Sequence, residues 1–311
     1  MNRPRPRRDG PPLGPSPRGR IACGPVRAIA LLAAGVLGAC GGSEAPRPAA
    51  AGPARRVVSL APSHTELLFA LGAGDAVVGV TSFCDRPPEA RRRTVVGDAK
   101  SLSLEAVAAL EPDLVVVNAA GTEDALGPIR DRVRVLSVPT DTLSQLLDAV
   151  GVLGDAVGRP DRAGTLRSEM EAALAEARAR SAGRPPTQVL VVLARDPFVV
   201  AGRGSYVDAL LGTLGFGNAA GGIDAPWPAV SAEAVVALAP DAVVDASLGP
   251  TGRATGGSEA RDWWRRYPTI PAVRDGRIRA LSDEAVLRPG PDLAGALRAL
   301  EESVAPAPGG R

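Results

Sequence analysis

The sequence contains few of the side chains that build metal sites and nucleophilic active sites. Its 311 residues include one histidine, His64, and three cysteines, Cys23, Cys40 and Cys84. It has no Cys-x-x-Cys pair, no His-Glu-x-x-His or Gly-x-Ser-x-Gly motif and no phosphate-binding glycine-rich loop. One histidine without clustered cysteines argues against a structural zinc, and a single cysteine beyond residue 40 excludes a disulfide framework.

An exported α/β hydrolase-like enzyme remains one alternative, and it would have to use His64. The available nucleophiles are Ser63 and Cys84. Ser63 is better explained as the N-cap of a helix, since Ser63-His-Thr-Glu66 has the capping-box pattern. Nothing in the sequence brings Cys84 close to His64. We therefore expect a protein that is not an enzyme.

The N-terminus also lacks an apolar run long enough to span a membrane. Residues 28–39 are apolar, but about 12 residues cannot cross a hydrocarbon layer of about 30 Å. This run follows seven arginines and ends in Leu37-Gly38-Ala39-Cys40, which resembles the lipobox of bacterial lipoproteins. We expect residues 1–40 to be a lipoprotein signal peptide, Cys40 to be lipidated, and the Gly-, Pro- and Ala-rich residues 41–54 to form a flexible tether. The alternative is an ordinary signal peptide with no role for Cys40.

Cleavage before Cys40 changes the charge of the chain. It would remove seven arginines and one aspartate, and so turn a net charge of +2 into −4. No basic stripe interleaved with aromatic residues is present, so nucleic acid is not an expected partner. We expect an exported protein in the periplasm or at the cell surface that contacts the membrane through its lipid anchor only.

A 14-residue segment occurs twice. Residues 103–116 and 231–244 are identical at ten of 14 positions, and each copy has a Ser N-cap, a short amphipathic helix, a Pro-Asp break and a Val-rich strand. Their spacing of 128 residues is the size of a lobe. We predict an α/β fold of two Rossmann-like lobes with parallel sheets, residues 55–158 and 185–304, joined by a single long connector helix within 159–184, with a tail at 305–311. The alternative is that this helix is one more core helix of a single domain.

Ligands of open α/β sheets bind beside the carboxyl ends of the strands. Aromatic residues make up only 3% of the chain, so an aromatic in a predicted loop is a conspicuous candidate for ligand contact. Local core packing is the alternative for each of them. The predicted ligand-binding residues follow strands and are His64, Phe83, Phe198, Trp227, Glu284, Leu287 and Arg288.

Each copy of the repeat places a glutamate, Glu105 or Glu233, in the first turn of its helix. The helix dipole favours an acidic residue there, so duplicated capping chemistry explains both. Two carboxylates projecting from two lobes could equally contact two basic sockets on a symmetric partner. From the residues alone, helix capping and partner contact are equally good explanations of the two glutamates.

Four stretches together resemble the periplasmic cobalamin and ferric-siderophore binding proteins: residues 56–66 (RVVSLAPSHTE), 79–88 (GVTSFCDRPP), 226–233 (PWPAVSAE) and 288–291 (RPGP). The resemblance covers about residues 55–304. It implies two α/β lobes joined by one long helix, a small hinge motion, no resident cofactor, and delivery of ligand to the permease dimer of an ABC importer. In that family the glutamates at the positions of Glu105 and Glu233 meet arginines of the two permease subunits.

Within that family, residues 83–85 and 226–231 most resemble the vitamin B12 binders. The resemblance therefore implies cobalamin or a related corrinoid as the transported ligand, contacted by Phe83 and by the loop 284–288. Phe83 stands where tyrosine is common, Arg86 replaces an aromatic residue, and Asp292 replaces a basic residue, which weakens the case for an anionic siderophore.

Haem or a ferric siderophore is the alternative ligand. A haem binder uses histidine or tyrosine as an axial iron ligand, and the candidates beyond residue 40 are His64, Tyr206 and Tyr267.

Overall fold

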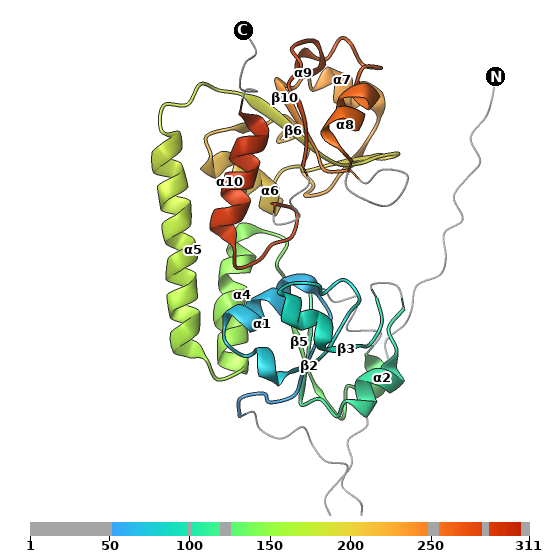
Figure 1. The fold of residues 1–311 in the computed structure, drawn as a ribbon, viewed down its shortest axis with the longest axis vertical. Coiled ribbons are helices and arrows are strands. Elements are labelled where there is room, and N and C mark those ends of the chain that lie inside the picture. The colour runs from blue at the N-terminus through green and yellow to red at the C-terminus, as the bar shows by residue number, and fades with distance from the viewer. Residues whose placement is uncertain (1–51, 99–100, 119–125, 248–254, 282–285, 306–311) are drawn as a thin grey trace, which may run out of the picture. The chain divides into compact units, whose positions relative to one another are not determined.

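The computed structural model describes residues 52–98, 101–118, 126–247, 255–281 and 286–305, which all belong to one unit spanning residues 45–311 (Figure 1). The predictions for Cys40, for the signal peptide and for Glu284 fall outside the described residues, as does most of the predicted tether. None of the described helices combines the length and the apolar character needed to cross a bilayer.

The first lobe is built on a parallel sheet with the strand order β3-β2-β1-β4-β5. Valine-rich runs form its central strands, and alternate residues face opposite sides: Val57 packs with α1, whereas Val58 packs with α2. The strands are β1 (Val57–Ser59), β2 (Val77–Val80), β3 (Thr94–Val95), β4 (Leu114–Val117) and β5 (Arg134–Ser137). The helices are α1 (Pro62–Ala70), α2 (Leu104–Ala109), α4 (Leu143–Ala156) and the short 3₁₀ helices η1 (Gly74–Ala76), η2 (Pro88–Arg92) and η3 (Gly127–Ile129).

The second lobe contains a mixed sheet with the order β11-β10-β6-β7-β9, and β8 also pairs with β6. Strands β8, β10 and β11 follow the parallel pattern, but β7 runs antiparallel to both of its neighbours, β6 and β9, so the prediction of a parallel sheet was wrong at this edge. The cause is the two-residue connection Asp196–Pro197, because strands joined by so short a turn must run antiparallel. The strands are β6 (Gln188–Arg195), β7 (Phe198–Val200), β8 (Gly217–Asn218), β9 (Ala229–Val230), β10 (Ala242–Asp245) and β11 (Ile278–Ala280).

Five helices accompany this second sheet: α6 (Tyr206–Thr213), α7 (Ala232–Ala237), α8 (Gly257–Trp264), α9 (Pro271–Arg274) and α10 (Leu293–Val304). Val235 of α7 and Trp264 of α8 join one buried cluster with Leu190, whereas Leu297 of α10 joins the other with Val191. Both faces of the sheet are therefore covered. The predicted α/β fold with two lobes is confirmed.

The longest of the described helices, α5 (Pro160–Ser181), lies between the two lobes in the chain and contacts both. Near its start, the Arg162 guanidinium donates a hydrogen bond to the Ala70 carbonyl of α1; at its end, the Ser181 hydroxyl donates to the Thr213 carbonyl of α6. It also packs along α4 and α10, and Figure 1 shows α5 alongside both, with α10 above α4. The lobes also contact each other directly, since the Tyr206 amide donates to the Asp141 carbonyl.

Candidate ligand-binding site

A cavity of about 650 Å³ lies where the strands of both lobes end. Ala61 to Ser63 follow β1, Asn118 follows β4, and Ala246 follows β10, so the cavity occupies the carboxyl ends of the parallel strands. Its lining is mostly apolar, with a few polar groups, which is typical of a pocket for a large organic ligand. The lining residues are Ala61, Pro62, Ser63, Asn118, Thr140, Asp141, Leu193, Trp227, Ala246, Leu287, Arg288 and Pro289.

The polar groups of the first lobe are held in place by hydrogen bonds to one another. The Asn118 side-chain oxygen accepts hydrogen bonds from the Thr140 amide (3.1 Å) and the Thr140 hydroxyl (3.0 Å). The Asn118 amide group donates to Asp141 at 3.4 Å, and the Ser63 and Thr140 hydroxyls lie 3.2 Å apart. These side chains present a fixed polar edge to a ligand.

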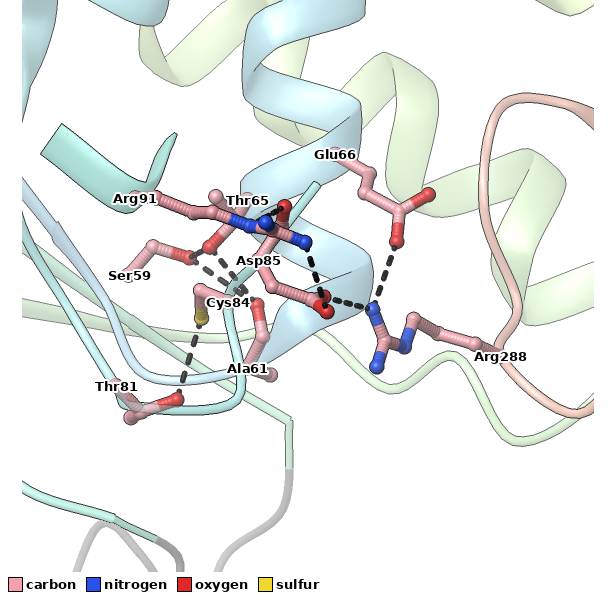
Figure 2. Close-up of polar contacts among 9 residues, drawn as sticks. All are labelled: Ser59, Ala61, Thr65, Glu66, Thr81, Cys84, Asp85, Arg91 and Arg288. Carbon is pink, nitrogen blue, oxygen red and sulfur yellow. Dashed lines mark hydrogen bonds and ion pairs between the residues drawn. The ribbon is translucent and has the colours of Figure 1, made fainter. Parts of the chain in front are cut away.

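Arg288 contributes a cation to the cavity and links the second lobe to two carboxylates of the first (Figure 2). Its Nη1 donates to Asp85 Oδ1 at 2.7 Å and to Glu66 Oε1 at 3.4 Å. Burial raises the pKa of Glu66 and outweighs the opposing effect of Arg288. Burial also works against ionisation of Asp85, but the hydrogen bond and charge of Arg288 outweigh it and lower the pKa of that carboxyl. We take Asp85 as the main partner because its contact is the shorter one.

His64 does not line the cavity. Helix α1 begins at Pro62 with Ala61 as its N-cap, so Ser63 is not the cap and His64 lies fully buried in the first turn. Its Nε2 lies 2.7 Å from the Val138 carbonyl, and because a carbonyl only accepts, this nitrogen carries the proton of the neutral ring. Burial lowers the pKa of His64 to about 4.

The residues proposed for an enzyme are not brought together. The Ser63 hydroxyl bonds to Thr140, the buried Cys84 thiol lies 3.2 Å from the Thr81 hydroxyl, and His64 bonds to Val138. Within the described part of the chain, no hydrogen bond joins His64 to Ser63 or Cys84. The hydrolase alternative has no support in this geometry.

The predicted aromatic contacts divide into three cases. Trp227 lines the cavity. Phe83 is 53% exposed on the loop after β2, two residues before Asp85, but it is not among the lining residues. Phe198 is buried at the start of β7, where it packs against Trp263, Trp264 and Tyr267. The alternative of local core packing therefore holds for Phe198, and we leave it and His64 out of the proposed contacts.

The cavity lining includes the predicted residues Leu287 and Arg288. It also includes residues that were not predicted from the sequence, namely Asn118, Thr140, Asp141 and Leu193. The missed residues lie within or just beyond strands β4, β5 and β6. The rule that ligands bind beside strand ends would have identified them if it had been applied to every strand of the predicted sheets.

Glu105 and Glu233 are exposed in the first turns of α2 and α7. Hydrogen bonds from its own amide and from Ser231 lower the pKa of Glu233, so this carboxylate is charged at neutral pH. Neither residue lines the cavity. Their exposure leaves them available to a partner.

The model of the periplasmic binding protein family matches residues 57–285. The chain belongs to this family. A substrate-binding lipoprotein of an ABC transporter in Bacillus subtilis, itself uncharacterised, is 31% identical over 81% of this chain and 80% of its own length. The vitamin B12-binding protein of Salmonella typhimurium is 31% identical over 71% of this chain and 81% of its own.

A solved family structure is also similar to this chain. The periplasmic heme-binding protein of Roseiflexus sp. RS-1 in its apo form is 30% identical, covers 81% of this chain and 98% of its own, and superimposes with a TM-score of 0.66. Proteins similar to this chain are thus named for two different tetrapyrroles, vitamin B12 and heme.

Proposed function

We propose that this protein is the substrate-binding component of an ABC importer and that it carries cobalamin or a related corrinoid. The observation that carries the proposal is the largely apolar cavity shared by both lobes, whose lining combines Trp227, Leu193 and Leu287 with a fixed polar edge. A corrinoid has a broad apolar ring face and many peripheral amides. Such a ligand suits aromatic and aliphatic walls together with Asn, Thr and Ser hydrogen-bonding groups.

Haem is the second candidate, favoured by the similarity to the Roseiflexus protein. A haem site of the common type needs an axial histidine or tyrosine. The described lining residues include neither, His64 and Tyr206 are fully buried, and Tyr267 packs in the aromatic cluster of the second lobe. The donor set therefore favours a ligand whose metal already has its own axial groups, as cobalamin does.

Titration with cyanocobalamin, followed by calorimetry and visible absorption, tests this proposal. We expect one site, and we expect Trp227→Ala to weaken binding about tenfold or more, because a central aromatic contact is typically worth 1.4 kcal/mol or more. Trp263→Ala is the matched control, since Trp263 packs against Phe198 and Arg266 outside the cavity. Equal affinities of the two variants would contradict the assigned site.

Glu105 and Glu233 are our proposed contacts with the permease, and Cys40 is our proposed lipid anchor at the periplasmic or outer cell surface. In reconstituted vesicles we expect Glu105→Arg/Glu233→Arg to abolish uptake while leaving cobalamin affinity unchanged. Glu176→Arg/Glu302→Arg, with the same charge change at exposed sites on α5 and α10, should transport normally. Lost affinity in the first variant would assign the pair to the ligand site instead.

A further inference from the structure

Arg288 is the only cationic side chain among the described residues that line the cavity, and carboxylates already hold it. Asp85 accepts from its Nη1 at 2.7 Å and Glu66 at 3.4 Å. The exposed fraction of the side chain is 18% for Arg288, 38% for Asp85 and 13% for Glu66, so water screens the charges of this cluster only partly. We call these three residues the Arg288 cluster.

The position of each partner in the Arg288 cluster is fixed by other parts of the fold. Glu66 projects from α1, and a side chain at Gly290 would place its Cβ 3.0 Å from the Glu66 carboxylate, so glycine leaves room for it. On the other side, the Arg91 Nε donates to the Asp85 carbonyl at 3.0 Å, and its guanidinium lies 3.7 Å from the Asp85 carboxylate. Figure 2 shows the Asp85 carboxylate between the two arginines, and shows Asp85 and Glu66 meeting the same nitrogen of Arg288.

This arrangement makes the cavity unfavourable for an anionic ligand. A ligand carboxylate that binds Arg288 would compete with Asp85 and Glu66, which both contact its Nη1, and would add a further negative charge beside them in a half-buried site. It would also approach Asp141, a lining carboxylate that accepts a 3.4 Å hydrogen bond from Asn118. A ligand with peripheral amides meets neither penalty, since an amide can donate to Asp141 and bond to Asn118 and Thr140.

We propose that Glu66 and Asp85 determine the charge class of the ligand: they neutralise Arg288, so that the cavity accepts a corrinoid with amide side chains and rejects one with free carboxylates. This inference rests on the proposed corrinoid function and adds its selectivity. Glu66 and Asp85 act through Arg288 and are therefore positioning residues. The same logic disfavours haem, whose two propionates are anionic at neutral pH.

The test uses two corrinoids with the same ring and the same cyanide ligands, dicyanocobinamide with amide side chains and dicyanocobyrinic acid with free carboxylates. We expect the wild-type protein to prefer the amidated ligand by about tenfold or more, the equivalent of about 1.4 kcal/mol. Glu66→Gln/Asp85→Asn frees the charge of Arg288, so the preference should fall about tenfold through tighter binding of the acid. Adding Arg288→Gln to the double variant should remove the gain in affinity for the acid, whereas adding Arg288→Lys should keep part of that gain.

Glu176→Gln/Glu302→Gln is the matched control, because it removes two carboxylates outside the cavity and should leave the preference unchanged. If the double variant does not fold, Asp85→Asn alone, at the more exposed partner, should still reduce the preference. An unchanged preference in folded variants, or a wild-type preference for the acid, overturns this inference and leaves the corrinoid function standing. Binding of neither corrinoid overturns the function and the inference with it.

Discussion

The two lobes contain the same 14-residue unit and attach it to their sheets in the same way. A serine caps each helix, Ser103 for α2 and Ser231 for α7, by accepting a backbone hydrogen bond at 3.1 and 3.2 Å. The aspartate after each helix accepts from the backbone that leads into the central strand, Asp113 from Arg55 and Arg56, and Asp241 from Gln188. Even the residue between helix and proline is alike, since Glu111 and Ala239 both have a φ of 44°.

Beyond this unit the lobes differ in how they fill their cores. The first lobe contains two of the nine aromatic residues, Phe69 and Phe83, and its sheet is parallel throughout. The second contains the other seven, and four of them form one cluster of Phe198, Trp263, Trp264 and Tyr267 beside its antiparallel edge. Similar local sequence therefore specifies the same helix-strand unit, whereas the unrepeated residues determine the core and the edges of each sheet.

The largest difference between the lobes should be at Trp264, which belongs to a cluster of four aromatic rings that the first lobe, with two aromatic residues, cannot form. Trp264→Ala would leave a cavity in the aromatic cluster and would remove the indole donor of the fully buried Asp245. We expect a loss of about 3–5 kcal/mol in the free energy of unfolding, measured by urea denaturation. A loss below about 1 kcal/mol would show that the aromatic cluster is not a main support of the second lobe.

His64 should make the stability of the first lobe depend on pH. Its folded-state pKa, about 4, lies below the ordinary value of 6.5, so between these values the unfolded chain binds the additional proton. Stability should thus be full above pH 6.5 and fall by about 3 kcal/mol towards pH 4, at 1.36 kcal/mol per unit of pKa shift. Denaturation curves for His64→Gln should lack this fall; the same pH dependence in that variant would assign it to other groups.

Val107 and Val235, equivalent residues of the two copies, should be equally important. Both are fully buried, each on the inner face of its helix. We expect Val107→Ala and Val235→Ala each to cost about 2 kcal/mol, from two lost methyl groups and the space they leave. Urea denaturation of both variants would test this equality, which fails if the costs differ by more than about 1 kcal/mol.

The smallest effects should come from the helix caps. Ser103→Ala and Ser231→Ala each remove one side-chain acceptor from an exposed helix start, at a cost of about 1 kcal/mol. Thermal unfolding of the two variants, with Ser258→Ala as an exposed control that caps no helix, would measure it. If only one of the two serine variants lost stability, the two units would not be equivalent.

The repeat made the α/β architecture predictable because a capped helix, a Pro-Asp break and a Val-rich strand are local signals. Trp227, Leu287 and Arg288 could be placed at the cavity because they follow or precede strands whose ends share one side of the fold. The Arg288 cluster could not, since its partners are 203 and 222 residues apart from Arg288 in the sequence. Contacts at that separation depend on how the lobes fold and pack.

The residues whose roles were predicted wrongly lie at the ends of helices and strands, and local sequence patterns do not define those ends. Ser63 matched the capping-box pattern, but Pro62 is favoured at the first helical position, which puts His64 on the buried side of α1. Phe198 follows β6 closely enough to suggest a loop, yet the two-residue turn Asp196–Pro197 returns the chain as a strand and directs Phe198 into the core. This two-residue turn was enough to make the predicted ligand contact a core residue.

The most direct test of the account is a calorimetric titration of the wild-type protein, without its signal peptide, with cyanocobalamin and separately with haem. We predict one cobalamin bound per chain with a dissociation constant in about the micromolar range or tighter, and haem bound at least about tenfold more weakly. Tight haem binding with a Soret shift and no response to cobalamin would contradict both the proposed ligand and the proposed charge selection by Glu66 and Asp85.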